Sequence, residues 1–348
     1  MRTAGILLVT ALALAGVSAR TAPVPAFQPV LVAFDVSHDR LYSTVPAEAG
    51  SRSSLVFFSG LGQEGSPVPS SMELPGVASG LFYDAETNSL FIANSSDHEL
   101  LIFDRVDSGS VRSPTRVLRK FTFPTGVYVD RAEGRLFVLD AHPGSLLVFD
   151  HGSSIRGERQ PDRLISGRKS GLNGPFSIAA DPKRSRLYVS NFDGVLIFNL
   201  HDLSAAPERL DLPSGTLARG LALDPQSGWL YIAAPMIHSL FVYDGLKSKR
   251  VKIQGETGLF PFSLALDSNR RKIFLSGVDP KIGVMNLPAP VGSDGTIPEE
   301  QSIERWFQLE GNAPPHFEHP VPPAPPGGIS SPPGGFVFDK SSDGWKAS

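Results

Sequence analysis

Short apolar segments alternate with turn-forming residues along most of this chain, in a unit that recurs six times. Each unit is an apolar run that ends in aspartate, a polar turn and a second apolar run. The six copies read LVAFDVSHDRLYSTV, GLFYDAETNSLFIAN, GVYVDRAEGRLFVLD, SIAADPKRSRLYVSN, GLALDPQSGWLYIAA and SLALDSNRRKIFLSG. Their shared residues are Asp35, Asp84, Asp130, Asp181, Asp224 and Asp267, which recur every 43 to 51 positions. A period of this size indicates stacked or radially arranged units.

Each copy predicts four strands. In the fifth copy the strands are expected at 220–224, 228–233, 239–244 and 251–253, because these runs are rich in Leu, Ile, Val, Phe and Tyr and are bounded by turn residues. Third strands are expected in the other copies at 55–58, 100–104, 146–150, 195–199 and 282–286. No stretch has helical spacing of apolar residues over a useful length. The pattern therefore predicts an all-β fold, a six-bladed β-propeller of four-stranded antiparallel blades over residues 29–309.

The order of the strands also predicts how the ring closes. Blade one starts with its innermost strand, and blade six has an outer strand of its own at 303–309. Each blade is therefore expected to be contiguous in sequence, with closure by side-chain packing between blades one and six.

Two phrases carry a family resemblance. FPTGVYVDRAEGRLFVLDAHPGSLLVFD and GPFSIAADPKRSRLYVSNFDGVLIFNL resemble NHL-type and YVTN-type propeller repeats, and ERQPDRLISG resembles the outer strand that often links such repeats. The resemblance covers residues 29–309 and implies an exported, bacterial-like propeller. It implies no single activity, because this scaffold carries scaffolding proteins, ligand binders, lactonases and lyases.

The two ends of the chain differ from the repeats. Arg2, the apolar stretch 5–17 and the small residues 17–19 have the pattern of a secretory signal peptide, expected to span residues 1–19. The mature protein is then expected to be secreted, periplasmic or extracellular, without a membrane span. Residues 310–348 form a Pro/Gly-rich tail that is expected to be disordered, although FVFD at 336–339 resembles a third strand and is an alternative edge strand.

Composition narrows the classes of partner. Charged residues make up 19% of the chain and the net charge is −3, so no basic surface for nucleic acid is predicted. The chain contains no cysteine, so no disulfide can stabilise the fold.

The six aspartates are predicted to be structural. Each ends an inner strand, and proline follows at Pro182 and Pro225. A carboxylate at such a position can accept backbone N–H groups of the turn.

The opposite face is the predicted ligand-binding face. There the residue before each inner strand and the residue that ends each second strand should lie together, and these positions vary while the strands agree. The candidate residues are Ser79, Asn94, Thr125, Asp140, Phe176, Asn191, Arg219 and Phe262. Arg219 is suited to a ligand carboxylate or to Asp140. The alternative is that the Asn and Asp residues only shape turns.

The sequence thus predicts a binding or scaffold module for an unknown protein, peptide, glycan or small molecule, with no cofactor. The alternative is a calcium-assisted hydrolase of the lactonase or esterase kind. Calcium requires several oxygen ligands, and the innermost positions of the candidate face contain neither Asp nor Glu. No catalytic residue and no metal ligand is assigned.

Overall fold

The computed structural model describes the repeats and the last strands of the chain. The described residues are 30–46, 52–61, 69–106, 113–152, 155–254, 260–288, 297–309, 338–341 and 344–347. The expected signal peptide and nearly all of the expected tail lie outside them. Among the described residues no helix is long and apolar enough to span a membrane.

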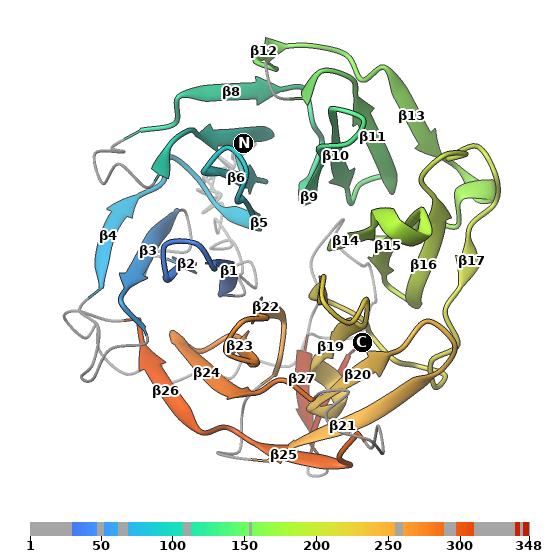
Figure 1. Cartoon of the computed structure of the whole chain (residues 1–348). Coiled ribbons are helices and arrows are strands. Elements are labelled where there is room, and N and C mark those ends of the chain that lie inside the picture. The colour runs from blue at the N-terminus through green and yellow to red at the C-terminus, as the bar shows by residue number, and fades with distance from the viewer. Residues whose placement is uncertain are drawn as a thin grey trace, which may run out of the picture.

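Six sheets stand around a central axis and form a six-bladed β-propeller (Figure 1). Blade 1 comprises β1 (Leu31–Asp35), β2 (Arg40–Pro46), β3 (Ser53–Ser59) and β4 (Ser70–Glu73). Blade 2 comprises β5 (Ala78–Asp84), β6 (Ser89–Asn94), β7 (Glu99–Phe103) and β8 (Arg116–Arg119). Blade 3 comprises β9 (Pro124–Asp130), β10 (Arg135–Asp140), β11 (Ser145–Phe149) and β13 (Arg163–Ser166).

The second half of the ring repeats this plan. Blade 4 comprises β14 (Ile178–Asp181), β15 (Arg186–Asn191), β16 (Gly194–Asn199) and β17 (Glu208–Arg209). Blade 5 comprises β18 (Leu221–Leu223), β19 (Leu230–Ala234), β20 (Ser239–Tyr243) and β21 (Ser248–Gln254). Blade 6 comprises β22 (Ser263–Asp267), β23 (Lys272–Ser276), β24 (Lys281–Asn286) and β26 (Arg305–Gln308). Single 3-10 turns occur at Arg168–Ser170, Pro182–Arg184 and Pro235–Ile237.

Two blades carry a fifth strand that the repeats did not predict. β12 (Gly157–Glu158) pairs in parallel with β8 of blade 2, although it lies in the connection to the outer strand of blade 3. β25 (Glu300–Ser302) likewise leaves blade 6 and pairs in parallel with β21 of blade 5. The outer edge of a blade therefore accepts a strand from the next blade. Near the C-terminus, β27 (Phe338–Ser341) pairs with β28 (Gly344–Ala347).

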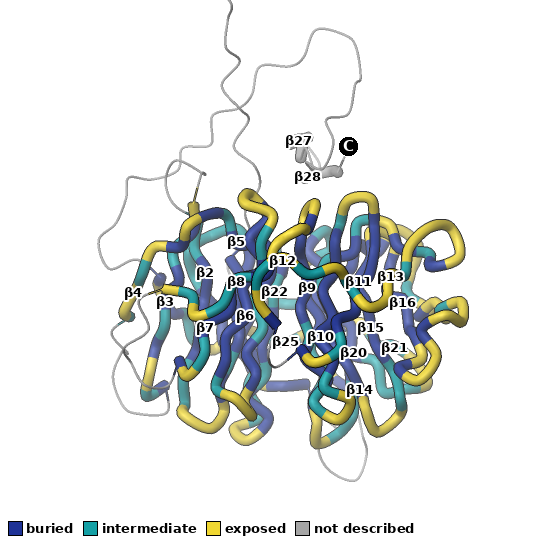
Figure 2. Tube along the Cα trace, turned by 90° about the horizontal axis from the view of Figure 1, so that it is seen from above, coloured by how far each residue is buried: buried dark blue, intermediate teal, exposed yellow. Residues whose placement is uncertain are grey.

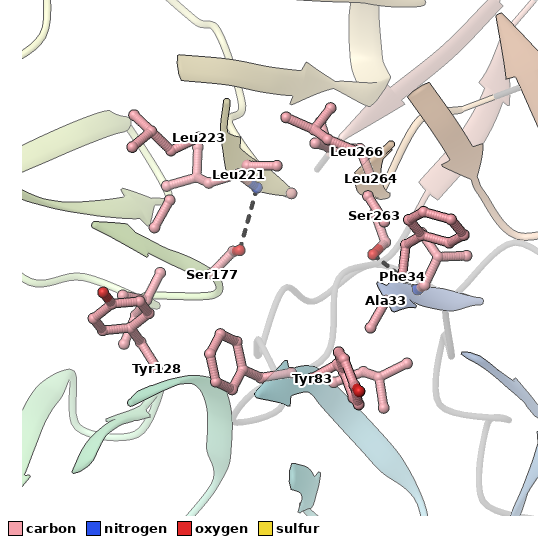
Figure 3. Close-up of a pocket in the computed structure, with 18 of the residues that line it drawn as sticks. Ala33, Phe34, Tyr83, Tyr128, Ser177, Leu221, Leu223, Ser263, Leu264 and Leu266 are labelled. Atoms are coloured by element: carbon pink, nitrogen blue, oxygen red, sulfur yellow. Dashed lines mark hydrogen bonds between the residues drawn. The ribbon is translucent and has the colours of Figure 1, made fainter. Parts of the chain in front are cut away.

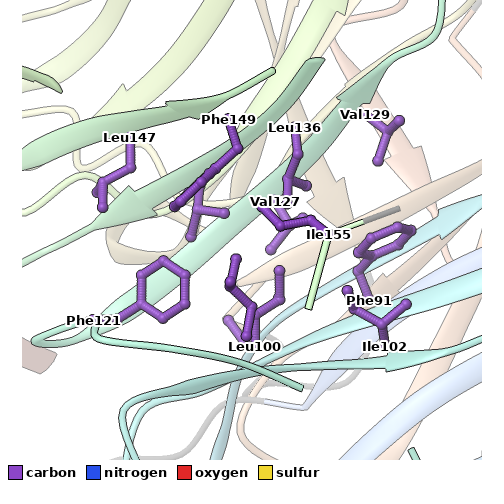
Figure 4. Packing of buried hydrophobic residues seen from close by; sticks show 13 residues of the cluster. Phe91, Leu100, Ile102, Phe121, Val127, Val129, Leu136, Leu147, Phe149 and Ile155 are labelled. Atoms are coloured by element: carbon purple, nitrogen blue, oxygen red, sulfur yellow. The ribbon is translucent and has the colours of Figure 1, made fainter. Parts of the chain in front are cut away.

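The hydrophobic core consists of six clusters, one between each pair of neighbouring blades. β10 shows why: Leu136 and Val138 join the cluster shared with blade 2, shown in Figure 4, whereas Phe137 and Leu139 join the cluster shared with blade 4. Successive side chains of a strand point to opposite faces of its sheet, and here both faces are buried. The strands are thus almost continuously apolar, and exposed residues concentrate in the turns at both ends (Figure 2).

Blades 1 and 6 close the ring through buried bonds as well as packing. Their shared cluster places Phe34 against Phe274, with ring centres 5.0 Å apart. The Val30 N–H donates to the Gly277 carbonyl at 2.8 Å, and Ser276 Oγ donates to the Val30 carbonyl at 2.7 Å. The predicted contiguous blades are confirmed for the four main strands of each sheet.

Candidate functional site

An elongated cavity of about 400 Å³ follows the axis of the propeller. The innermost strands of all six blades line it, and Figure 3 shows their side chains around the open space. Leu223, Leu266 and Phe34 are among the apolar side chains at its wall, and each is only partly buried. The volume is in the range of small-molecule sites.

The cavity exists because one position of the repeat is mostly small. Two residues before the shared aspartate, four blades carry alanine, namely Ala33, Ala179, Ala222 and Ala265. The neighbouring blades 2 and 3 carry Phe82 and Tyr128 there, whose rings meet edge to face with centres 5.6 Å apart. Alanine leaves space that a larger side chain would fill, so the cavity has an aromatic wall on one side and room on the other.

The cavity opens at the face that carries the shared aspartates. Four of its lining residues lie in the turns just beyond the inner strands and are exposed, namely Val36, Pro225, Gln226 and Asn269. A groove between blades 4 and 5 continues from this mouth and shares Tyr128, Ala180, Leu223, Pro225 and Gln226 with the cavity. The mouth therefore lies on the face opposite to the predicted ligand-binding face.

The other end of the channel is narrow. Four residues before the aspartate, Gly80, Gly126 and Gly220 allow neighbouring inner strands to touch. A Cβ on Gly126 or Gly220 would lie 2.9 or 2.8 Å from a carbonyl oxygen of the next blade. Ser177 and Ser263 occupy the same position in blades 4 and 6, and their Oγ atoms accept the N–H groups of Leu221 and Val32 at 3.2 and 3.1 Å (Figure 3).

Phe176 and Arg219 lie at this narrow end. Phe176 lies just before the inner strand of blade 4. Its side chain packs against the hydrophobic cluster between blades 1 and 2, on the far side of the ring. The guanidinium carbon of Arg219 lies 5.1 Å from the ring centre of Phe176 and 6.0 Å from that of Phe262. Arg219 is 1% exposed, and burial lowers its pKa to about 10, so it stays cationic at neutral pH. Aromatic faces stabilise such a desolvated cation.

The predicted pairing of strand starts with strand ends is confirmed. Ala78 lies opposite Asn94 and Pro124 opposite Asp140, so the eight candidate residues belong to one end of the blades. Ser79 and Thr125 link blades there: Ser79 Oγ donates to the Pro124 carbonyl at 2.6 Å and Thr125 Oγ1 to the Pro175 carbonyl at 2.9 Å.

The polar side chains at the ends of the second strands, those of Asn94, Asp140 and Asn191, form hydrogen bonds with nearby loops. Asp140 accepts the backbone N–H groups of Thr122 and Phe123 at 2.6 and 2.7 Å. The Asn191 side chain accepts the Asn173 N–H at 2.6 Å and donates to the Gly171 carbonyl at 3.0 Å. Asn94 donates to Asp97 at 3.0 Å. Asp140 and Asn191 thus hold the loops that precede the inner strands of blades 3 and 4, whereas the Asn94 bond lies in the turn between the second and third strands of blade 2. Ligand binding by this face stays a prediction.

The turn role of the shared aspartates is confirmed in five blades. Asp35, Asp84, Asp181, Asp224 and Asp267 each accept one or two backbone N–H groups of the following turn. Asp130 differs, because its two side-chain hydrogen bonds within the described residues come from the Arg135 guanidinium. Every one of the six also contacts a basic side chain: His38, Arg131, Arg135, Arg184, Arg271 or Arg270.

Arginines on this face also connect each blade to its neighbour. The links run from Arg40 to the Val106 carbonyl, Arg131 to Asp84, Arg135 to the Leu200 carbonyl, Arg184 to the Gly228 carbonyl, Arg271 to Asp224 and Arg270 to Asp39. We call this ring the arginine belt. Five of the six shared aspartates pair with an arginine of this belt, and the described residues contain no cluster of three His, Asp or Glu side chains suited to a metal ion.

Two serine hydroxyls line the cavity near its narrow end. The hydroxyls of Ser177 and Ser263 accept N–H groups, and their own hydrogens have no acceptor among the described residues, so both can donate to a ligand. Tyr128 adds a phenol whose pKa burial raises to about 12.

Besides the shared aspartates, the repeats have small residues at two positions that indicate the channel. In the aligned copies, glycine or serine stands four residues before the aspartate in five blades, and alanine stands two residues before it in four. Small residues in phase around a ring indicate close approach or open space at the axis. Which of the two occurs follows only from the positions of the strands.

Comparison with known proteins supports the fold. Hydrazine synthase of Kuenenia stuttgartiensis is similar with a TM-score of 0.54 and 11% identity, covering 76% of this chain and 78% of that chain. The β-propeller domain of Cps50 (Swd1) from Myceliophteria thermophila matches with a TM-score of 0.49 and 14% identity, covering 66% and 71%. Neither a family model nor a curated protein matches the sequence. The support comes from hydrazine synthase, and at 11% identity that similarity concerns the fold alone.

Proposed function

We propose that this protein is a β-propeller binding module that takes a small, mainly apolar molecule into its axial cavity. The observation that carries the proposal is a cavity of about 400 Å³ with apolar side chains on its wall and an exposed mouth on the aspartate face. The ligand enters between the inner strands and displaces water from side chains such as Phe34, Leu223 and Leu266. Each methylene group buried there contributes about 0.8 kcal/mol.

The polar groups of the cavity give the ligand an orientation. Ser177 and Ser263 are donors near the narrow end. A ligand with an acceptor atom at its inner end matches this arrangement. The cavity is lined by strands of a closed ring, so few protein groups have to become ordered when the ligand enters. This lowers the entropic cost of binding.

Titration with N-phenyl-1-naphthylamine, an uncharged apolar fluorophore, tests the proposal. Saturable binding is expected, with a fluorescence increase as the dye leaves water. Ala222→Phe fills the cavity and is expected to reduce affinity at least tenfold, and Ala222→Leu is a milder variant in case the larger side chain prevents folding. Leu164→Phe is the matched control, because Leu164 is 59% exposed on the outer strand of blade 3. Equal affinity of the folded Ala222 variants and the wild type would refute binding in the cavity.

We also propose that the module acts outside the cytoplasm. The support is the signal-like pattern of residues 1–19. Expression of the full chain in a bacterium, followed by mass spectrometry of the exported protein, is expected to give an N-terminus at Arg20. A product that retains residues 1–19 and stays in the cytoplasm would contradict this.

A further inference from the structure

We propose that the ligand of the axial cavity is amphipathic, with an apolar body inside the cavity and one anionic head group bound by Lys183 at the mouth. The inference rests on the proposed binding function and adds the chemical class of the ligand. It is carried by the position of Lys183 relative to the cavity and by the charges around it.

Lys183 reaches over the mouth from blade 4. It belongs to the 3-10 turn Pro182–Arg184, which directly follows inner strand β14. Its Nζ lies 3.4 Å from the carbonyl oxygen of Pro225 in blade 5. Pro225 lines both the axial cavity and the groove between blades 4 and 5, so the ammonium group stands where the two join. The side chain is exposed and can turn toward a bound ligand.

The neighbouring carboxylates leave this cation uncompensated. Asp181 is bonded to Arg184 at 2.6 Å, and Asp224 to Arg271 at 2.9 Å. In the described part of the chain no carboxylate oxygen lies within 4 Å of the Lys183 ammonium. Arg184 stands beside it, but its terminal nitrogen already donates to Asp181 and to the Gly228 carbonyl. Lys183 is thus an exposed cation at this rim that a ligand can reach.

The groove provides room for a head group beside the cavity. It has a volume of about 470 Å³ and is lined by Lys183, Pro182, Ser227, Gly228 and the ion pair of Asp181 with Arg184, in addition to the residues shared with the cavity. Tyr128 lines both spaces. An ammonium group above a cavity with apolar side chains on its wall favours a carboxylate or a similar anion and disfavours a cation.

Displacement of N-phenyl-1-naphthylamine by three molecules with the same chain length tests the inference, with decanoate, decanol and decylamine as competitors. In the wild type, decanoate is expected to compete best. Lys183→Gln should weaken the binding of decanoate about threefold to tenfold, because a partly exposed ion pair contributes no more than this to affinity. The affinity for decanol should not change. Lys183→Glu should invert the preference and make decylamine the better competitor.

Lys169→Gln is the matched control, because Lys169 is an exposed lysine that lines a separate groove beside Leu164 and His201. It should leave all three affinities unchanged. If Lys183→Gln weakens decanoate and decanol equally, or neither, the anionic head group is refuted while binding in the cavity stands. If the probe does not bind to the wild type at all, both proposals fail.

Discussion

Arg270 of blade 6 donates to Asp39 of blade 1 at 2.6 Å, although 231 positions separate them in the sequence. This bond completes the arginine belt across the point where the first and last blades meet. The four main strands of each blade come from one contiguous stretch of the chain, so none of them joins blade 1 to blade 6. Contacts such as the Arg270–Asp39 bond therefore hold the ring closed.

The exposed and the buried closure bonds should differ in strength. The side chains of Arg270 and Asp39 are 43% and 25% exposed, so Arg270→Ala and Asp39→Ala should couple by less than about 1 kcal/mol in a double-mutant cycle. Ser276→Ala removes a fully buried donor to the Val30 carbonyl and should lower the free energy of unfolding by about 1–2 kcal/mol. Urea denaturation of the four variants measures both values. A larger effect of the exposed pair would show that the belt, and not the buried bond, dominates closure.

Gly80→Ala should destabilise the propeller strongly. A Cβ at this position would lie 1.8 Å from the carbonyl oxygen of Thr125, which belongs to the inner strand of blade 3. The strand would have to move, at an expected loss of about 3 kcal/mol or more in the free energy of unfolding.

Gly157→Ala is the control for this variant. Gly157 has φ of 72° and no atom within 4 Å of the added Cβ, so only the backbone preference of glycine is lost, about 1 kcal/mol. Thermal melting compares the two, and equal losses would contradict the close approach of blades 2 and 3.

Asp104 and Arg116 should give blade 2 an acid-sensitive contribution to stability. Two bonds from the Arg116 guanidinium, at 2.6 and 2.8 Å, are the main cause that lowers the pKa of Asp104 to about 2. The unfolded value is near 3.9. Since the folded pKa is the lower one, the contribution is complete above about pH 4 and is lost as the pH falls through 2.

The stability difference between the wild type and Arg116→Ala should therefore be constant from pH 7 to pH 5 and shrink below pH 4. Urea denaturation at a series of pH values measures this difference. Arg119→Ala is the control, because it removes an exposed arginine of the same strand that pairs with Glu99 instead. A difference that grows toward pH 2 would contradict the assignment.

Calcium should not stabilise the protein through its six aspartates. Each of these carboxylates already contacts a basic side chain, and five also accept backbone N–H groups. Calcium would have to replace these bonds, so the melting temperature should be the same with calcium chloride, with sodium chloride at equal ionic strength and with EDTA. A melting temperature that rises with calcium concentration would reveal a site formed by other ligands.

The repeats themselves could be predicted because their causes are local. A short apolar run, an aspartate that bonds its own turn and a second apolar run specify two paired strands without reference to the rest of the chain. The predicted third strand at 146–150 corresponds to β11 at Ser145–Phe149, and ERQPDRLISG contains β13, the outer strand of blade 3. Burial on both faces of each sheet explains why these runs are so uniformly apolar.

Contacts between blades were decided only by the tertiary structure. β12 and β25 are too short to be recognised and depend on an edge that another blade presents. The partner of Arg131 is Asp84, 47 positions earlier, and nothing near Arg131 in the sequence indicates it. The chain thus determined six blades, their turns and their order by local pattern. The axial cavity, its mouth and the cation above it arise from residues of different blades, and only the closed ring brings them together.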